Sequence, residues 1–199
     1  MEPEIIGNSY DQIAEKWRDL PIQSYGMAQL ERAVRFVKNR GSALDVGCGS
    51  QGRMIDLLQK EGFQPEGLDI SQEMIAHARK RHPSATFHNA DISRWSFPRP
   101  FELIVAWDSA WHLPLNLQEP VLRKICANLP SGGVYLFTTV GFDKPGDHGD
   151  SGYMGVPLAY GTLGIPRLLE LVSVFGCVCR HLEFDQFPEK HLSVIIQKL

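Results

Sequence analysis

The residues with the clearest potential for chemistry lie in the segment LDVGCGSQG, at positions 44–52. Gly47, Gly49 and Gly52 follow a short apolar run and precede a helical pattern, so they predict a tight turn from a strand into a helix. Such a turn lets a ligand approach the backbone N–H groups closely. Asp69 falls 20 residues after Gly49, at the expected end of the next strand, where a carboxylate can accept hydrogen bonds from the two hydroxyls of a ribose.

The glycine turn and Asp69 can lie close together only if strands and helices alternate along the chain, so that the two strand ends meet at one edge of a sheet. From Ser42 onward, short apolar runs alternate with helical patterns, which is typical of an α/β domain with a mostly parallel sheet. The expected strands are residues 42–47, 65–70, 85–91, 101–108 and 134–140, and the expected helices begin at residues 53, 72, 120 and 166. Two last strands, at 177–185 and 192–198, are separated by so short a turn that they must be antiparallel.

Two segments stand outside this alternation. Residues 1–40 hold two amphipathic helical patterns separated by Pro21, and we expect both helices to pack on the sheet rather than to form a domain. Residues 141–163 contain six glycines and no clear period, so we expect a long loop of the kind that is usually functional or disordered. A length of 199 residues is that of one domain with a full hydrophobic core.

Composition and charge exclude several classes of protein. The formal net charge of −3 disfavours nucleic acid and acidic membranes as partners. The four cysteines lack paired CxxC spacing, which excludes a zinc ribbon, and no two histidines have a metal-ligand spacing, so no metal is expected. No stretch reaches the roughly 20 apolar residues of a membrane span, and MEPEIIGNSY lacks the basic start and apolar run of a signal peptide, so we expect a cytoplasmic protein.

Two further acidic positions identify a family resemblance. Asp45 lies two positions before the first glycine of the turn, and Asp91 with Ile92 ends the third expected strand. With these features the sequence from Tyr10 to Leu199 resembles the S-adenosylmethionine-dependent methyltransferases with a Rossmann-like fold. The resemblance implies a seven-stranded, mostly parallel sheet with an antiparallel last strand and helices on both faces. The family turn is usually GxGxG, whereas GCGSQG has one extra residue, so Ser50 and Gln51 are expected to meet the cofactor differently.

The resemblance also implies S-adenosyl-L-methionine as the cofactor and a role for each matching residue. The glycine turn would line its methionyl and ribose region, Asp69 would bind the ribose hydroxyls, Ile70 would pack on adenine, and Asp91 would meet the adenine amine. Trp107 would lie beside the sulfonium. The complete implied cofactor set is Asp45, Gly47, Cys48, Gly49, Gly52, Asp69, Ile70, Asp91, Ile92, Ala106 and Trp107.

The end of the fourth expected strand indicates the class of acceptor. Residues 107–112, WDSAWH, match neither the run of amino-methylating nucleic-acid enzymes nor the Pro-Cys of cytosine C5 enzymes, so we expect a small-molecule acceptor. We expect residues 141–163 to form a lid over this acceptor, with His148 and Tyr153 facing the methyl group together with His112. These three residues are the candidate catalytic groups, although a base is needed only if the acceptor must lose a proton first.

Two other functions remain open at this point. A nicotinamide-dependent oxidoreductase would share the glycine turn and Asp69, but it would leave Asp45 and Asp91 unexplained. A noncatalytic module that binds S-adenosylmethionine would keep the fold, because fold alone does not determine activity. Such a module has no need of an elaborate segment at 141–163.

Overall fold

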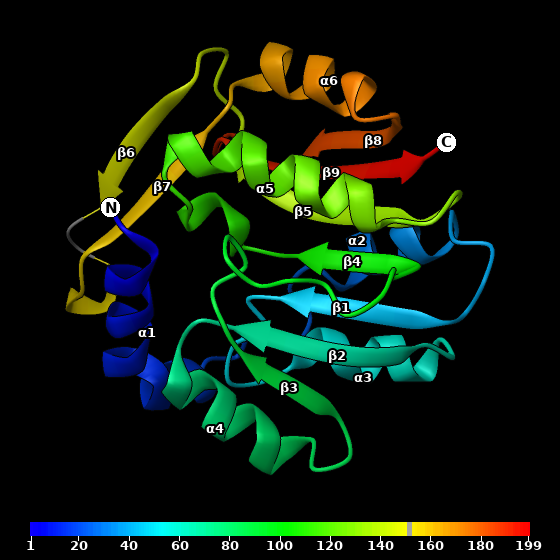
Figure 1. The fold of residues 1–199 in the computed structure, drawn as a ribbon. Coiled ribbons are helices and arrows are strands. Elements are labelled where there is room, and N and C mark those ends of the chain that lie inside the picture. The colour runs from blue at the N-terminus through cyan, green and yellow to red at the C-terminus, as the bar shows by residue number, and fades with distance from the viewer. Residues whose placement is uncertain (151–152) are drawn as a thin grey trace.

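The computed structural model describes residues 1–150 and 153–199, except for the side chains of Asp150 and Tyr153. Seven strands form the main sheet in the order β3-β2-β1-β4-β5-β9-β8 (Figure 1). Strands β1 to β5 run parallel, and β9 runs antiparallel to both of its neighbours, β5 and β8, which confirms the expected sheet. The strands are β1 (Ser42–Val46), β2 (Gln64–Asp69), β3 (Thr86–Asn89), β4 (Leu103–Ala106), β5 (Val134–Val140), β8 (Cys177–Phe184) and β9 (His191–Lys198).

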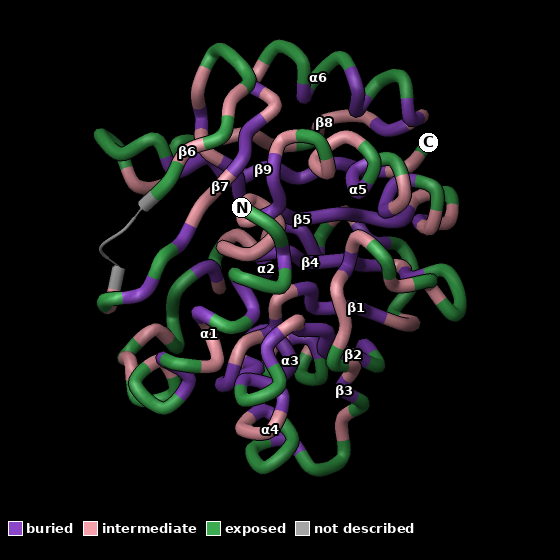
Figure 2. The backbone as a smooth tube through the Cα atoms, turned by 60° about the vertical axis from the view of Figure 1, so that its left-hand side comes forward, coloured by how far each residue is buried: buried purple, intermediate pink, exposed green. Residues whose placement is uncertain are grey.

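Helices cover both faces of this sheet, as expected. On one face, α2 (Met27–Val34) and α3 (Arg53–Lys60) bury residues such as Leu30 and Leu58 against the strands. On the other face, α5 (Leu115–Asn128) and α6 (Ile165–Val174) pack on the largest apolar cluster. Helix α4 (Gln72–Arg81) shares a smaller cluster with α3 beside β3. Strands β1, β4, β5 and β9 are almost entirely buried (Figure 2), which explains the continuous apolar runs of β4 and β5.

Helix boundaries show one correct and one wrong expectation. Ser71 caps α4 as expected, because its hydroxyl oxygen accepts the N–H of Met74 at 3.0 Å. Helix α5 was expected to begin near Pro120, but it begins at Leu115, with Pro120 inside it. A carboxylate from a distant segment explains the earlier start, since Asp147 Oδ1 accepts the Leu115 N–H at 2.7 Å.

The described part of residues 141–163 contains two paired strands, so the expectation of a loop without secondary structure was wrong. Strand β6 (Gly146–Asp150) pairs antiparallel with β7 (Leu158–Thr162), and a short 3₁₀ turn, η2 (Tyr153–Gly155), precedes β7. The hairpin is stabilised from outside, because Val156 and Leu158 pack with Ile6 and Ile13 of the first helix. No pattern within residues 141–163 could show this contact, which is why the segment resembled a loop.

The first helix, α1 (Pro3–Arg18), does not pack on a face of the sheet as expected, although α2 does. Figure 1 shows α1 beside α4 and the β6–β7 hairpin, at the edge to which the arrowheads of β1, β2 and β4 point. That edge carries the carboxyl ends of the parallel strands, where α/β sheets bind ligands. In the described parts of the chain, no helix is long and apolar enough to cross a membrane.

Candidate functional site

A cavity lies at the carboxyl edge of the sheet, between the strand ends and α1. Its empty space is about 810 Å³, including the solvent at its mouth. The turns after β1, β2, β3 and β4 form its base, and α1 forms its cover. The residues expected from the sequence that line it are Gly47, Gly49, Asp69, Ile70, Asp91, Ile92, Trp107 and His112.

The glycine turn has the backbone conformation that its sequence predicts. Gly47, Gly49 and Gly52 all have positive φ angles, of 71°, 61° and 54°. A Cβ atom on Gly47 would lie 2.1 Å from the Cβ of Ser109, so the turn approaches the end of β4 too closely for any side chain. Glycine at this position therefore keeps β1 and β4 close together beneath the cavity.

Asp69 lies at the end of β2 with its carboxylate fixed by the backbone. Its Oδ2 accepts the N–H of Gly49 and its Oδ1 accepts the N–H of Ser71, both at 2.9 Å. Burial raises the pKa of Asp69 to about 6, although the N–H donors oppose this shift. The carboxylate is therefore ionised at neutral pH and lies in the cavity wall, where it can accept hydrogen bonds from a ligand.

Four residues of the implied cofactor set do not line the cavity. Asp45 and Ala106 are buried within the strands, and burial raises the pKa of Asp45 to about 7. The Cys48 thiol packs with apolar side chains of α3 and α4, and burial raises its pKa well above the usual value. Gly52 faces the ring of His82. These four residues belong to the strands and to the glycine turn that bound the cavity, without lining it themselves.

Strand β3 and the turn after it provide the far wall. Asp91 and Ile92 line the cavity, just beyond the end of β3 at Asn89. Asp91 organises this turn, since its carboxylate accepts the Ser93 N–H at 2.8 Å and the Ser93 hydroxyl at 2.7 Å. Together with Ile70 these residues give the wall one anionic and two apolar side chains.

His112 is held from two sides in the short 3₁₀ helix η1 (Ala110–His112), which follows β4. Its Nδ1 lies 2.8 Å from the carbonyl oxygen of Ala159 in β7, so Nδ1 carries the proton. Nε2 then accepts the hydroxyl of Tyr10, at 2.9 Å. Burial lowers the pKa of His112, which keeps the ring neutral.

The other two candidate catalytic residues are not brought into the cavity wall. The ring of His148 lies against Phe142 and Tyr160, at centroid distances of 4.8 and 6.0 Å, and does not line the cavity. The side chain of Tyr153 lies outside the described residues. Of the three candidates, His112 alone is placed by the described structure at the cavity.

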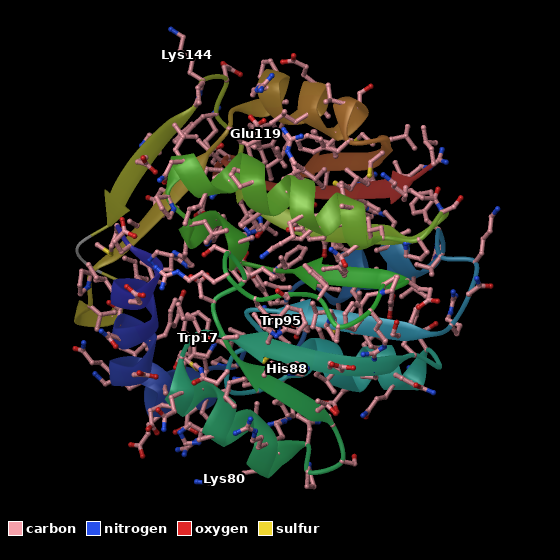
Figure 3. The ribbon with its side chains drawn as sticks, viewed as in Figure 1. Trp17, Lys80, His88, Trp95, Glu119 and Lys144 are labelled. Carbon is pink, nitrogen blue, oxygen red and sulfur yellow. The ribbon has the colours of Figure 1, made fainter. Side chains whose placement is uncertain are left out.

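Sequence reasoning missed the contribution of α1. Pro3, Ile6, Tyr10 and Trp17 line the cavity, and Figure 3 shows Trp17 pointing from α1 toward the strand ends. The amphipathic pattern with Trp17 on its apolar face was visible in the sequence. The pattern did not show that this face covers a cavity.

Gln51, in the longer glycine turn of this chain, forms hydrogen bonds that hold the end of α1 in place. The buried Nε2 of Gln51 donates to carbonyl groups at the end of α1 and just beyond it, with Arg18 O and Leu20 O each at 2.9 Å and Trp17 O at 3.2 Å. The last carbonyls of a helix have no partner within the helix. Gln51 therefore connects the glycine turn directly to the end of α1.

Replacing Gln51 with alanine should loosen α1. We expect the free energy of unfolding to fall by about 0.5–1.5 kcal/mol, because the hydrogen bonds from Gln51 to these carbonyl groups are lost. Hydrogen exchange of α1 amides should become faster while that of β1 and β4 stays unchanged. Gln118→Ala is the matched control, since Gln118 Nε2 also donates to backbone carbonyls, among them Leu113 O at 2.7 Å, but does not touch α1. Equal exchange of α1 in both variants would contradict the role of Gln51.

Comparison with known proteins identifies relatives of this chain. Residues 43–133 match a family model described as a methyltransferase domain. The dTDP-3-amino-3,4,6-trideoxy-alpha-D-glucopyranose N,N-dimethyltransferase of Streptomyces venezuelae is 39% identical over 121 residues, which are 60% of this chain and 50% of the relative. The trans-aconitate 2-methyltransferase of Afipia carboxidovorans is 33% identical over 92 residues, 45% of this chain and 35% of the relative. The chain thus spans half the length, or less, of these curated relatives.

A solved structure extends the likeness to the whole fold. The crystal structure of an S-adenosylmethionine-dependent methyltransferase from Clostridium acetobutylicum aligns with a TM-score of 0.71 over 97% of each chain, at 14% sequence identity. Residues 43–133 thus match a methyltransferase domain, and the whole chain has the fold of a solved S-adenosylmethionine-dependent methyltransferase.

Proposed function

We propose that this protein transfers a methyl group from S-adenosyl-L-methionine to a small-molecule acceptor. The observation that carries the proposal is the cavity at the carboxyl edge of the sheet, where the fixed carboxylate of Asp69 lies beside the glycine turn. The relatives named above act on an amino sugar nucleotide and on a small carboxylic acid, which supports a small acceptor. The formal charge of −3 also disfavours nucleic acid and acidic membranes as partners.

The residues of the cavity fit this cofactor. Asp69 provides an acceptor for ribose hydroxyls, and Asp91 with the apolar Ile70 and Ile92 suits a planar base that carries an amino group. Trp107 lines the cavity with only 4% of its surface exposed, and its Nε1–H has no hydrogen-bond partner among the described residues. A buried donor of this kind at a cavity wall is consistent with a site that is completed by a ligand.

The protein's contribution to the reaction would be alignment and exclusion of water. When bound, the cofactor supplies an electrophilic methyl group. Asp69 and the glycine turn would hold its nucleoside, and the residues after β4 would fix the acceptor in line with the methyl group. Tyr10 and Trp17 of α1 would keep water out, and His112 would keep the Tyr10 hydroxyl oriented.

We propose further that residues 1–199 act as a single cytoplasmic domain whose acceptor is covered by two segments. These segments are α1 and the hairpin of residues 141–163, and not the hairpin alone. Ser9 Oγ donates to Pro157 O at 2.7 Å, and His112 donates to Ala159 O, so the hairpin is joined to α1 and to the cavity wall. These contacts support a role of the hairpin as part of the lid.

Calorimetry with two ligands tests the proposed function. S-adenosylhomocysteine should bind with a Kd in the micromolar range or below, and NAD should not bind detectably at the same concentrations. Both molecules contain adenosine, so NAD is a control for recognition of adenosine alone. Tight binding of NAD without binding of S-adenosylhomocysteine would favour the oxidoreductase and overturn the proposal.

A further inference from the structure

Asp108 is an acidic residue at the cavity that neither the sequence pattern nor the family resemblance identified. It follows Trp107 at the carboxyl end of β4 and lines the cavity. Its φ angle is 53°, a left-handed conformation that is uncommon for a residue other than glycine. Thr138 of β5 fixes it there, because the Thr138 hydroxyl oxygen accepts the Asp108 N–H at 2.8 Å and the hydroxyl donates to Asp108 Oδ1 at 3.1 Å. Backbone held in this region often marks a functional position.

A buried histidine connects Asp108 to a second carboxylate. His191, the first residue of β9, has its Nε2 2.8 Å from Asp108 Oδ1 and its Nδ1 2.5 Å from Asp185 Oδ1. Both ring nitrogens therefore face carboxylate oxygens, an arrangement that only a doubly protonated ring satisfies. Burial alone would lower the pKa of His191, but the hydrogen bonds to Asp108 and Asp185 raise it to about 9.

Aromatic rings surround this imidazolium. The ring centroids of Trp111, Trp107 and Tyr25 lie 5.3, 5.6 and 6.3 Å from that of His191. Aromatic rings at these distances stabilise a cation and exclude water from it. The His191 side chain is accordingly 7% exposed and that of Asp185 6%, whereas that of Asp108 is 21% exposed.

The cluster of two carboxylates and one imidazolium thus has an excess negative charge, and Asp108 is its most exposed member. Asp108 Oδ1 is occupied by His191 and Thr138, while Oδ2 has no hydrogen-bond partner among the described residues. His112 Nε2 is also occupied, by the Tyr10 hydroxyl. The described residues of the cavity therefore suit an acceptor that becomes positively charged on methylation, because a carboxylate lies beside it. They do not suit an acceptor that a strong base must first deprotonate.

We propose that Asp108 holds an amine nitrogen of the acceptor at the position where the methyl group is transferred. His191 and Asp185 are positioning residues that hold Asp108 in place. This inference rests on the proposed function and specifies that the acceptor is an amine. A neutral amine donates an N–H to Asp108 Oδ2 and keeps its lone pair for the methyl carbon. As the nitrogen–carbon bond forms, the electrons of the carbon–sulfur bond stay on sulfur, and the positive charge passes to nitrogen. Asp108 stabilises the resulting ammonium, which then loses a proton to water.

An amino analogue of the cofactor tests this placement without knowledge of the acceptor. Sinefungin has an amino-bearing carbon where S-adenosylmethionine has its methyl-bearing sulfur, so it places an ammonium group where the methyl group would be delivered. Wild-type protein should bind sinefungin at least tenfold more tightly than S-adenosylhomocysteine, as measured by calorimetry. Asp108→Asn should remove this preference and change the Kd of S-adenosylhomocysteine by no more than about twofold. Asparagine adopts the left-handed conformation readily, so the variant should fold.

Asp143→Asn is the matched control, because Asp143 is an exposed aspartate outside the cavity and its change in charge is the same. This variant should keep the preference for sinefungin. Equal Kd values of the two ligands in wild-type protein, or an unchanged preference in Asp108→Asn, would overturn the inference. If S-adenosylhomocysteine itself does not bind wild-type protein, the proposed function fails first, and the inference fails with it.

Discussion

The Asp69→Ala variant should bind S-adenosylhomocysteine more weakly than wild-type protein by about 2–4 kcal/mol, because two hydrogen bonds from ribose hydroxyls to an ionised carboxylate are lost. At about 1.4 kcal/mol for each factor of ten, the Kd should rise roughly 30- to 1,000-fold. Calorimetry at neutral pH measures this directly. A Kd equal to that of wild-type protein would show that Asp69 does not bind the ribose.

The same variant should also lose stability. Asp69 accepts the backbone N–H groups of Gly49 and Ser71, and alanine would leave both without this acceptor. We expect the free energy of unfolding in urea to fall by about 1–3 kcal/mol. Glu102→Ala is the matched control, because Glu102 likewise accepts a backbone N–H, that of Ser42 at 2.9 Å, at the opposite end of β1. The control should lose stability and keep its cofactor affinity.

The pH dependence of wild-type binding provides a second measurement on Asp69. Its pKa is about 6 in the folded protein, and the ionised form is the better acceptor for hydroxyl groups. Affinity for S-adenosylhomocysteine should therefore be constant well above pH 6 and weaken as the pH falls through 6. The decline should reach about tenfold at pH 5. This component of the pH dependence should be absent in Asp69→Ala.

The Gly47→Ala variant should lose at least about 3 kcal/mol of stability. Part of this loss, about 1–2 kcal/mol, is the cost of a side chain at a φ angle of 71°. The remainder is the clash between the new Cβ and the Cβ of Ser109, which would be 2.1 Å apart. Ser109 cannot move away easily, because its hydroxyl donates to Val46 O at 2.6 Å. Urea unfolding of the purified variant measures the loss.

Gly62→Ala separates the two contributions. Gly62 also has a positive φ angle, of 86°, but a Cβ there would come no closer than 3.8 Å to Arg40. This control should lose only the backbone contribution of about 1–2 kcal/mol. If Gly47→Ala and Gly62→Ala lost the same free energy of unfolding, the contact between Gly47 and Ser109 would contribute nothing to stability. That result would contradict the tight packing of β1 against β4 beneath the cavity.

The sequence by itself determined the sheet and the base of the cavity. Burial on both faces requires continuous apolar strands, and the short turn before β9 requires an antiparallel end strand, so both features are recorded in local residue patterns. The glycine turn was predictable for the same reason, because positive φ angles at Gly47, Gly49 and Gly52 need glycine whatever surrounds them. Asp69 followed from its distance along the chain to the turn.

Only the tertiary structure decided which elements cover the cavity and which charged residues lie in its wall. The apolar face of α1 was visible, but its partners, Val156 and Leu158, lie in a hairpin that has little apolar pattern of its own. Asp108 follows β4, whereas Asp185 and His191 belong to the β8–β9 hairpin. The three residues form one charged cluster because β9 enters the sheet beside β5. Local patterns record how deeply a residue is buried and which backbone conformation it needs. They do not record which distant segment it meets, and in this protein such distant contacts form the cover and the charged wall of the site.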